Sequence, residues 1–249
     1  MFYINMLFIL FVLFGFAAQG ASIAQSDASP ASAHTPVARL STSAMTEAGG
    51  RVLTLFTHPA LPHKLWAGTA HGGLWQSADS GDSWTPASEA MRTLTVSSIA
   101  VDPGNPDIMY AGTGEGRSNE DTLRGVGMFR SEDGGVNWAL LPLTRPAMAG
   151  ESWSHINHIA VSSAGVLLAA TSDNSYNGFI YRSADGGQTW GLFPVYTGSK
   201  VGLRNMVYKV RFDPDNPNTA IFMDSFANVT HSADGGLSWM VVKKSSTCK

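Results

Sequence analysis

The chain has 249 residues, of which 14% are charged and 44% hydrophobic, a balance typical of a globular protein and not of a disordered one. The formal net charge is -3 and no block of like charges occurs, which argues against a nucleic-acid partner. The single cysteine, Cys248, excludes an intramolecular disulfide and a cysteine-based zinc site. Ordinary packing must therefore hold the fold together.

The first 24 residues are predicted to be a secretory signal peptide. Residues 2–18 are almost wholly apolar, and Ala18 and Gly20, or Ser22 and Ala24, supply the small residues that a signal peptidase requires. The alternative is an uncleaved membrane anchor, because the run approaches the length of a bilayer span. We expect a secreted, periplasmic or extracellular protein that contacts a membrane only through this segment if it is uncleaved. Residues 25–50, rich in Ala, Ser and Thr, are expected to be a linker.

A segment with the pattern S-x-D-x-G-x-x-W occurs four times after residue 50, and we call each copy a box. The defining residues are Ser77, Asp79, Gly81 and Trp84; Ser131, Asp133, Gly135 and Trp138; Ser183, Asp185, Gly187 and Trp190; Ser232, Asp234, Gly236 and Trp239. The tryptophans are 54, 52 and 49 residues apart, the period of a four-stranded propeller blade. The sequence therefore predicts an all-β β-propeller domain over residues 51–249, with blades at about 51–90, 91–143, 155–194 and 204–242.

Each unit is predicted to contain four strands, A to D. In the second unit these are residues 96–101, 108–112, 127–131 and 137–141, which are rich in aliphatic and aromatic side chains. The A–B turn carries Asp-Pro and Asn-Pro, here Asp102-Pro103 and Asn105-Pro106, and these positions are expected to stay outside the strand ladder. The box forms the C–D turn: its Gly adopts a positive φ, its Asp accepts backbone N–H groups, and its Trp covers the hairpin. We predict that the boxes are structural.

The four boxes resemble the Asp-box, or bacterial neuraminidase repeat, of sialidases, sortilin-type receptors and two-propeller xyloglucan hydrolases. The segments DPGNPDIMYAGTGEG and GVGMFRSEDGGVNW are most similar to secreted bacterial proteins described as glycosyl-hydrolase-like. The resemblance covers about residues 50–242 and implies a propeller, although propellers of this repeat family usually have six or more blades. Closure of four blades and a piece of a longer protein are both open interpretations.

The resemblance implies a function less directly than a fold. The sialidase motif Arg-Ile-Pro does not occur, and the xyloglucan hydrolases' catalytic Asp, in a T-D-x-G-G context, corresponds to Ala70 in Thr69–Gly73. We therefore predict a non-catalytic binding or scaffold module for carbohydrate or protein. The alternative is a glycoside hydrolase of the sialidase-like or xyloglucanase-like type, with its acid and base among Glu115, Glu120, Asp121, Glu151, Asp173 and Asp224.

The face opposite the boxes is the candidate binding surface. From Thr69, Thr113, Thr171 and Asp224 to the next box serine there are 8, 18, 12 and 8 residues, so units two and three carry insertions. Charged and aromatic residues there suit a glycan or a protein. The candidate ligand residues are Glu115, Arg117, Glu120, Asp121, Arg124, Trp153, Asp173 and Tyr176. In the structural alternative the arginines brace the loop by pairing with its acids, and Trp153 fills the gap between blades two and three.

No metal ion or cofactor is expected. His155 and His158 lie three apart in a predicted strand, where strict alternation would point them to opposite faces.

Overall fold

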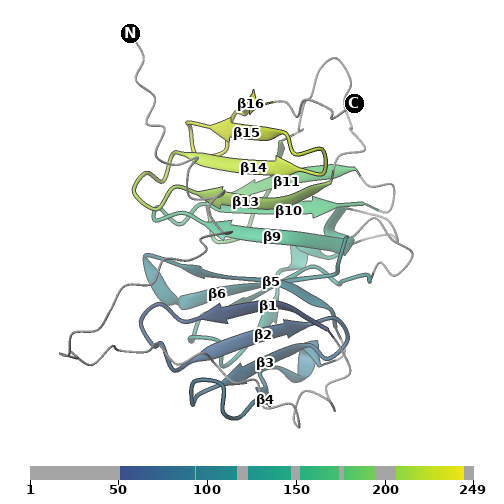
Figure 1. Cartoon of the computed structure of the whole chain (residues 1–249), viewed down its shortest axis with the longest axis vertical. Coiled ribbons are helices and arrows are strands. Elements are labelled where there is room, and N and C mark those ends of the chain that lie inside the picture. Colours follow the sequence, from purple (N-terminus) through teal and green to yellow (C-terminus); the bar gives the residue numbers. More distant parts are fainter. Residues whose placement is uncertain are drawn as a thin grey trace, which may run out of the picture. The chain divides into compact units, whose positions relative to one another are not determined.

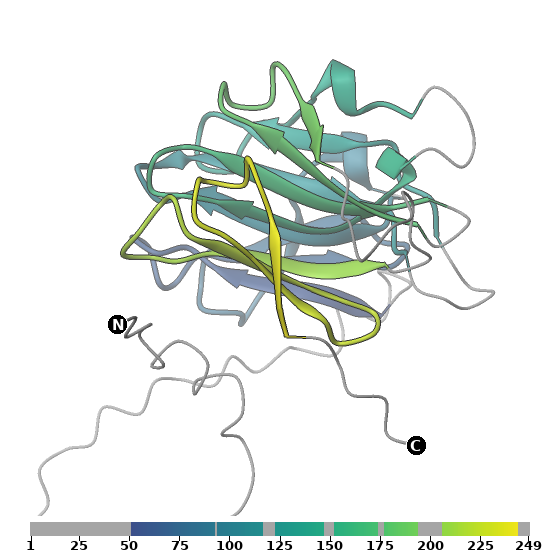
Figure 2. The same ribbon diagram turned by 90° about the horizontal axis from the view of Figure 1, so that it is seen from above.

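The computed structural model describes residues 51–92, 94–116, 123–146, 152–173, 177–193 and 206–243, all within the unit Val37–Lys249. They form four four-stranded antiparallel sheets, in each of which consecutive strands pair with one another (Figure 1). The prediction of four antiparallel blades is confirmed. Strands of all four sheets run across the view from above, with turns at both ends (Figure 2).

The strands of each blade follow the order A to D along the chain. Blade 1 consists of β1 (Val52–Thr57), β2 (Leu65–Thr69), β3 (Leu74–Ser77) and β4 (Thr85–Pro86). Blade 2 consists of β5 (Val96–Asp102), β6 (Asn105–Thr113), β7 (Met128–Ser131) and β8 (Ala139–Leu140). Blade 3 consists of β9 (His155–Val161), β10 (Leu167–Ser172), β11 (Gly178–Ser183) and β12 (Gly191–Phe193). Blade 4 consists of β13 (Val207–Phe212), β14 (Ala220–Asp224), β15 (Val229–Ser232) and β16 (Met240–Lys243).

Helical structure in the described residues is limited to three short 3-10 turns, at Glu89–Met91, Pro142–Thr144 and Ser152–Ser154. One predicted boundary is wrong. Strand β6 begins at Asn105, which pairs with Asp102, so the Asn105-Pro106 dipeptide lies inside the ladder. Proline is tolerated there because it stands at the beginning of the strand, where a missing N–H donor costs little.

The first strand of each blade is the innermost one. Strands β1, β5, β9 and β13 contact one another in that order along the chain (Figure 1). Each contains a β-bulge near its beginning, and β9 has it between Ile156 and His158. A bulge adds one residue, so side chains three apart share a face. This explains why Ile156 and Ile159 are both buried against blade 2, and it removes the strict alternation that was assumed for His155 and His158.

Three hydrophobic cores join consecutive blades. Blade 1 packs Trp66 and Leu74 against Val96 and Ile99 of blade 2. The core between blades 2 and 3 includes Tyr110, Met128, Ile156, Ile159 and Leu167, and that between blades 3 and 4 includes Leu168, Ile180, Val207, Val210 and Phe222. Burying one such side chain contributes about 1.5–3 kcal/mol, so these interfaces hold the blades together.

The box glycines also take part in these interfaces. Gly135 has a φ of 85° and lies against the ring of Trp66, a side chain of the preceding blade that is 1% exposed. Gly187 lies in the same way against Leu141, and Gly236 against Leu168. A box glycine therefore satisfies two requirements at once, a left-handed backbone and close approach of the previous blade.

Within each box the serine and aspartate form one hydrogen-bonded turn. In the third box, Ser183 Oγ donates to Asp185 Oδ1 at 2.7 Å and accepts from Gly187 N at 2.9 Å. Thr189 N donates to Asp185 Oδ1 at 2.9 Å. These bonds, first those from Thr189, lower the pKa of Asp185 to about 2, and the aspartates of the other three boxes have similarly lowered pKa values. The carboxylate groups are thus held charged by the turns that they cap.

Candidate functional site

A groove with a volume of about 710 Å³ runs along the innermost strands of all four blades, and we call it the inner groove. It is lined mainly by residues 53–56 of β1, 97–99 of β5, 157–158 and 160–161 of β9, and 208–209 and 211–212 of β13. Because these residues belong to strands, the packed blades fix their positions. The groove brings together side chains from all four blades, and it is the candidate functional site.

The two sides of the inner groove differ in chemistry. On the β1 side the lining is largely apolar, and Leu55 is 51% exposed. On the β13 side Lys209 and Arg211 are exposed, and Tyr208 is 37% exposed. Neither cation forms an ion pair with any side chain in the described part of the chain. The groove therefore offers one apolar wall and one cationic wall.

The floor of the groove is polar, and its side chains join neighbouring blades. Ser98 Oγ accepts a hydrogen bond from Ile159 N at 3.0 Å, and Ser97 Oγ donates to the Ile156 carbonyl. Asn157 Nδ2 donates to the Val207 carbonyl at 2.9 Å, which connects blade 3 to blade 4. The floor is consequently a fixed set of hydroxyl and amide groups.

His158 lies on the floor beneath the cationic wall. Burial lowers the pKa of its imidazole to about 4, and the charges of Arg211 and Lys209 lower that pKa further. Its Nδ1 is buried and has no hydrogen-bond partner. The ring is therefore neutral at pH 7, and it adds no positive charge to the groove.

An ion pair between blades 1 and 2 involves Glu115, one of the groove-lining residues. Arg51 Nη2 lies 2.5 Å from Glu115 Oε2, and the Glu115 side chain is only 7% exposed. The backbone of Glu115 pairs with Leu123, so the carboxylate is anchored where the insertion of unit two leaves the sheet. A Cβ at Gly116 would collide with Asn157 Oδ1 and with Ser172 Oγ, which shows how closely the insertion approaches blade 3.

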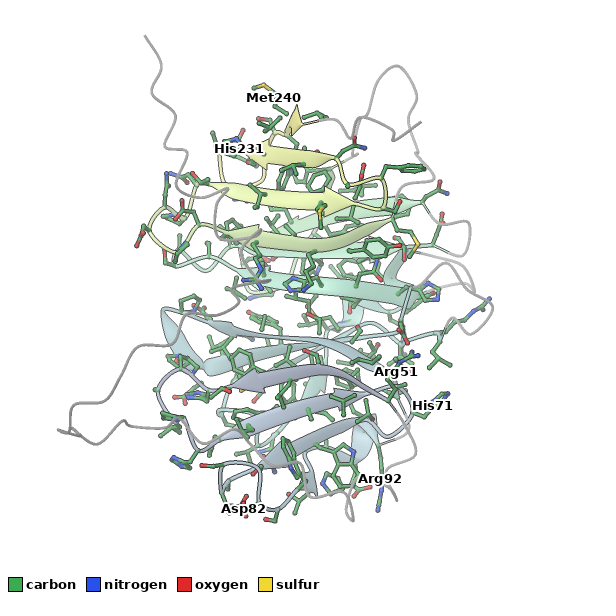
Figure 3. The ribbon with its side chains drawn as sticks, viewed as in Figure 1. Arg51, His71, Asp82, Arg92, His231 and Met240 are labelled. Atoms are coloured by element: carbon green, nitrogen blue, oxygen red, sulfur yellow. The ribbon has the colours of Figure 1, made fainter. Side chains whose placement is uncertain are left out.

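The boxes and the B–C and D–A connections lie at opposite ends of the strands. In Figure 3, Asp82 of the first box lies at one end of blade 1, and His71 and Arg92, in the B–C and D–A connections, lie at the other. Among the predicted ligand residues that the structure describes, Glu115 is the one that lines the groove. Arg124 is exposed; burial, and then the charge of Arg124, lower the pKa of His155. Arg117, Glu120, Asp121, Glu151 and Tyr176 lie outside the described residues.

Trp153 occupies the space between blades 2 and 3. It is 7% exposed, and its ring centroid lies 4.4 Å from that of Tyr181 and 5.0 Å from that of Trp190. Such a ring offers little surface for stacking on a ligand. The geometry matches the alternative in which this tryptophan fills the gap between blades.

Two of the predicted acid–base candidates cap turns. Asp173 accepts hydrogen bonds from Asn177 N at 2.9 Å and from Asn177 Nδ2 at 2.8 Å. Asp224 makes the same two contacts with Asn228, at 2.9 and 2.8 Å. Their oxygens are thus used in the B–C turns of blades 3 and 4. Ala70 occupies the corresponding region of blade 1, where it is 3% exposed and has no group that transfers a proton.

The lining residues of β9 and β13 were missed by the sequence-based prediction, which placed the site on loops alone. A signal was present in the pairs Val52/Leu55, Val96/Ile99, Ile156/Ile159 and Val207/Val210, each three apart at the start of a unit. This spacing marks the bulged inner strand. In β5, β9 and β13 the pair is buried against the preceding blade, whereas in β1, which no described blade precedes, Leu55 is 51% exposed and lines the groove.

No family model matches the chain. Among curated proteins, it is 26% identical over 206 residues to an oligoxyloglucan-reducing end-specific xyloglucanase of Emericella nidulans, with 78% of this chain and 24% of that protein covered. It is 28% identical over 205 residues to a xyloglucanase of Acetivibrio thermocellus, with 72% and 24% covered. The chain thus spans about a quarter of the length of these relatives.

Solved structures show the same fold. The crystal structure of the GH74 xyloglucanase from Xanthomonas campestris matches with a TM-score of 0.56 at 18% identity, over 76% of this chain and 29% of that one. A GH74 enzyme of Niastella koreensis matches with a TM-score of 0.54 at 22% identity, over 75% and 28%. The predicted propeller fold is confirmed, and its sequence relatives are glycoside hydrolases.

Within the described ranges, no helix has the length and hydropathy needed to cross a membrane. The same ranges contain no group of three His, Cys, Asp or Glu side chains placed to hold a metal ion.

Proposed function

We propose that the chain engages polysaccharide along the inner groove, as a propeller unit of the xyloglucanase type that works outside the cell. The observation that carries the proposal is the groove itself. It combines an exposed apolar wall around Leu55 with a floor of hydroxyl and amide groups around Ser97 and Asn157. Sugar rings present apolar C–H faces and polar hydroxyls, which such a surface can contact together. The xyloglucanase relatives support polysaccharide as the ligand class.

Hydrolysis is the second candidate function, because the relatives are named as xyloglucanases. A glycosidase of the usual kind needs two carboxyl groups about 5–9.5 Å apart. The carboxylates among the described groove residues are Glu115, which pairs with Arg51, and Asp213, which accepts a hydrogen bond in the turn after β13. Both are engaged in contacts of the fold, so binding is proposed first and hydrolysis second.

Export from the cell belongs to the same proposal. The apolar residues 2–18, followed by small residues, have the character of a secretion signal, and a polysaccharide ligand would be met outside the cell. N-terminal sequencing of the mature protein, recovered from the medium or periplasm, tests this part. We expect a new N-terminus near residue 25, and an intact Met1 would contradict cleavage.

Titration calorimetry of the full chain with xyloglucan oligosaccharides, beside a reducing-sugar assay on the polymer, tests the proposed function. Leu55→Ser should weaken binding several-fold, because it removes an apolar contact from the groove wall. Leu192→Ser is the matched control: this leucine is 48% exposed on the outermost strand β12, and its loss should leave affinity unchanged. Equal effects of the two variants, or no binding of any neutral or acidic glycan by the parent, would overturn the proposal.

A further inference from the structure

The cationic wall of the inner groove is not explained by a neutral polysaccharide. Lys209 and Arg211 lie two residues apart on β13, and their partners on β14 are Met223 and Ile221, so both project from the same face of the sheet. Residues at this spacing are about 7 Å apart along a strand. Both side chains are exposed, and neither has an acidic partner in the described part of the chain.

The acidic residues of the groove form no ion pair with these two cations. Glu115 is engaged with Arg51. Asp213 lies in the turn after β13, where its Oδ1 accepts a hydrogen bond from Asp215 N at 2.9 Å. His158, on the floor below the two cations, is neutral at pH 7. Among the described residues the two cations therefore lie close together without an ion-pair partner, and an anionic ligand would relieve their mutual repulsion.

The chemistry opposite the cations narrows the kind of anion. The β1 wall presents Leu55 and Phe56, and the floor presents Ser97 and Asn157. A carboxylate can form charge-assisted hydrogen bonds with Arg211 and Lys209, while the ring that carries it lays its C–H face on the apolar wall. A simple inorganic anion would use only the cations, whereas a sugar acid uses both walls and the floor.

We infer that the inner groove selects an acidic glycan, a polysaccharide that carries uronate carboxylates, with Lys209 and Arg211 binding the carboxylates. The inference rests on the proposed function, since it assumes that glycan binds in the groove, and it goes further by naming the charge of the ligand. Lys209 and Arg211 then determine specificity, and the apolar wall and the floor supply contacts common to acidic and neutral sugars.

The test is titration calorimetry of the full chain with an oligogalacturonate, with its methyl ester of equal length, and with a neutral xyloglucan oligosaccharide. We expect the acid to bind at least tenfold more tightly than the ester, and the advantage to shrink with added salt because the contacts are ionic. Lys209→Gln and Arg211→Gln should each weaken binding of the acid about five- to tenfold and leave binding of the ester unchanged. Arg92→Gln is the control, since this arginine is 62% exposed outside the groove.

The outcomes separate the two proposals. Equal affinity for acid, ester and neutral sugar would overturn the selection of acidic glycans and leave polysaccharide binding intact. Absence of binding to all three sugars would overturn the proposed function and this inference together. A polyglutamate of matched charge that binds as tightly as the oligogalacturonate would show that charge alone is recognised, and this too would contradict a glycan-specific site. Retained melting temperatures of both Gln variants establish that any loss of affinity is not unfolding.

Discussion

Replacing Gly135 by Ala should destabilise the protein more than the same change at Gly81, although both are box glycines. The two residues have φ values of 85° and 98°, a region that costs an L-residue about 1–2 kcal/mol. At Gly135 a Cβ would also lie 2.9 Å from Trp66 Cζ2 and Nε1, on a ring that is 1% exposed and held in the first inter-blade core. Such overpacking costs about 1–3 kcal/mol more. Gly81 belongs to the first blade, and no described blade precedes it in the chain to supply such a contact.

Gly135→Ala should therefore lower the free energy of unfolding by about 2–5 kcal/mol and Gly81→Ala by about 1–2 kcal/mol. For a domain of this size the difference corresponds to a gap in melting temperature of about 2–12 °C. Urea unfolding followed by tryptophan fluorescence measures both free energies on the same protein background. Equal losses at the two glycines would refute the argument that a box glycine is needed for inter-blade packing as well as for its backbone conformation.

Three further predictions concern pH and packing. The folded pKa of Asp185 is about 2, below its unfolded value near 3.8, so its stabilising effect should be complete above about pH 4 and fade between pH 4 and 2. In melting scans, Asp185→Asn should therefore lose less stability than the parent as the pH falls through this range. The same pH dependence in both proteins would contradict the capping role. His158 has a folded pKa of about 4 against 6.5 unfolded, so stability should fall as the pH drops from about 6.5 to 4, and His158→Gln should reduce that slope. The remainder is expected from His155, whose pKa burial also lowers, and an undiminished slope would contradict the role of His158. Trp153→Ala should cost about 3–5 kcal/mol by opening a cavity and leave glycan affinity of the folded protein unchanged; weaker binding with normal melting would instead make this ring a stacking platform.

The sequence repeat predicted the architecture because each copy of the box corresponds to one four-stranded blade. The box spacing placed the C–D turns, and the predicted segments 127–131 and 137–141 contain β7 and β8. The bulges of the inner strands were not foreseen, since hydrophobic residues three apart do not fit the two-residue period of a regular strand. Only the pairing of β9 with β10 shows where the extra residue is accommodated.

Of the groove residues, Glu115 was named from the sequence as a candidate, but neither of the two cations was. Lys209 and Arg211 read in sequence as ordinary exposed charges of a strand. Their role depends on which strands of other blades lie opposite, and the residues that line the groove are up to 161 positions apart along the chain, from Leu53 to Pro214. Trp153 illustrates the converse, because a loop tryptophan gives no sign in sequence of whether it packs between blades or faces solvent.

The most direct test of the central claim is a crystal structure of the full chain with a bound oligosaccharide, either an oligogalacturonate or a xyloglucan fragment. We expect sugar density in the inner groove, with rings against Leu55 and, for the acid, carboxylates at Lys209 and Arg211. Density found only at the outer strands or at the box turns, with these three side chains free of sugar, would contradict it.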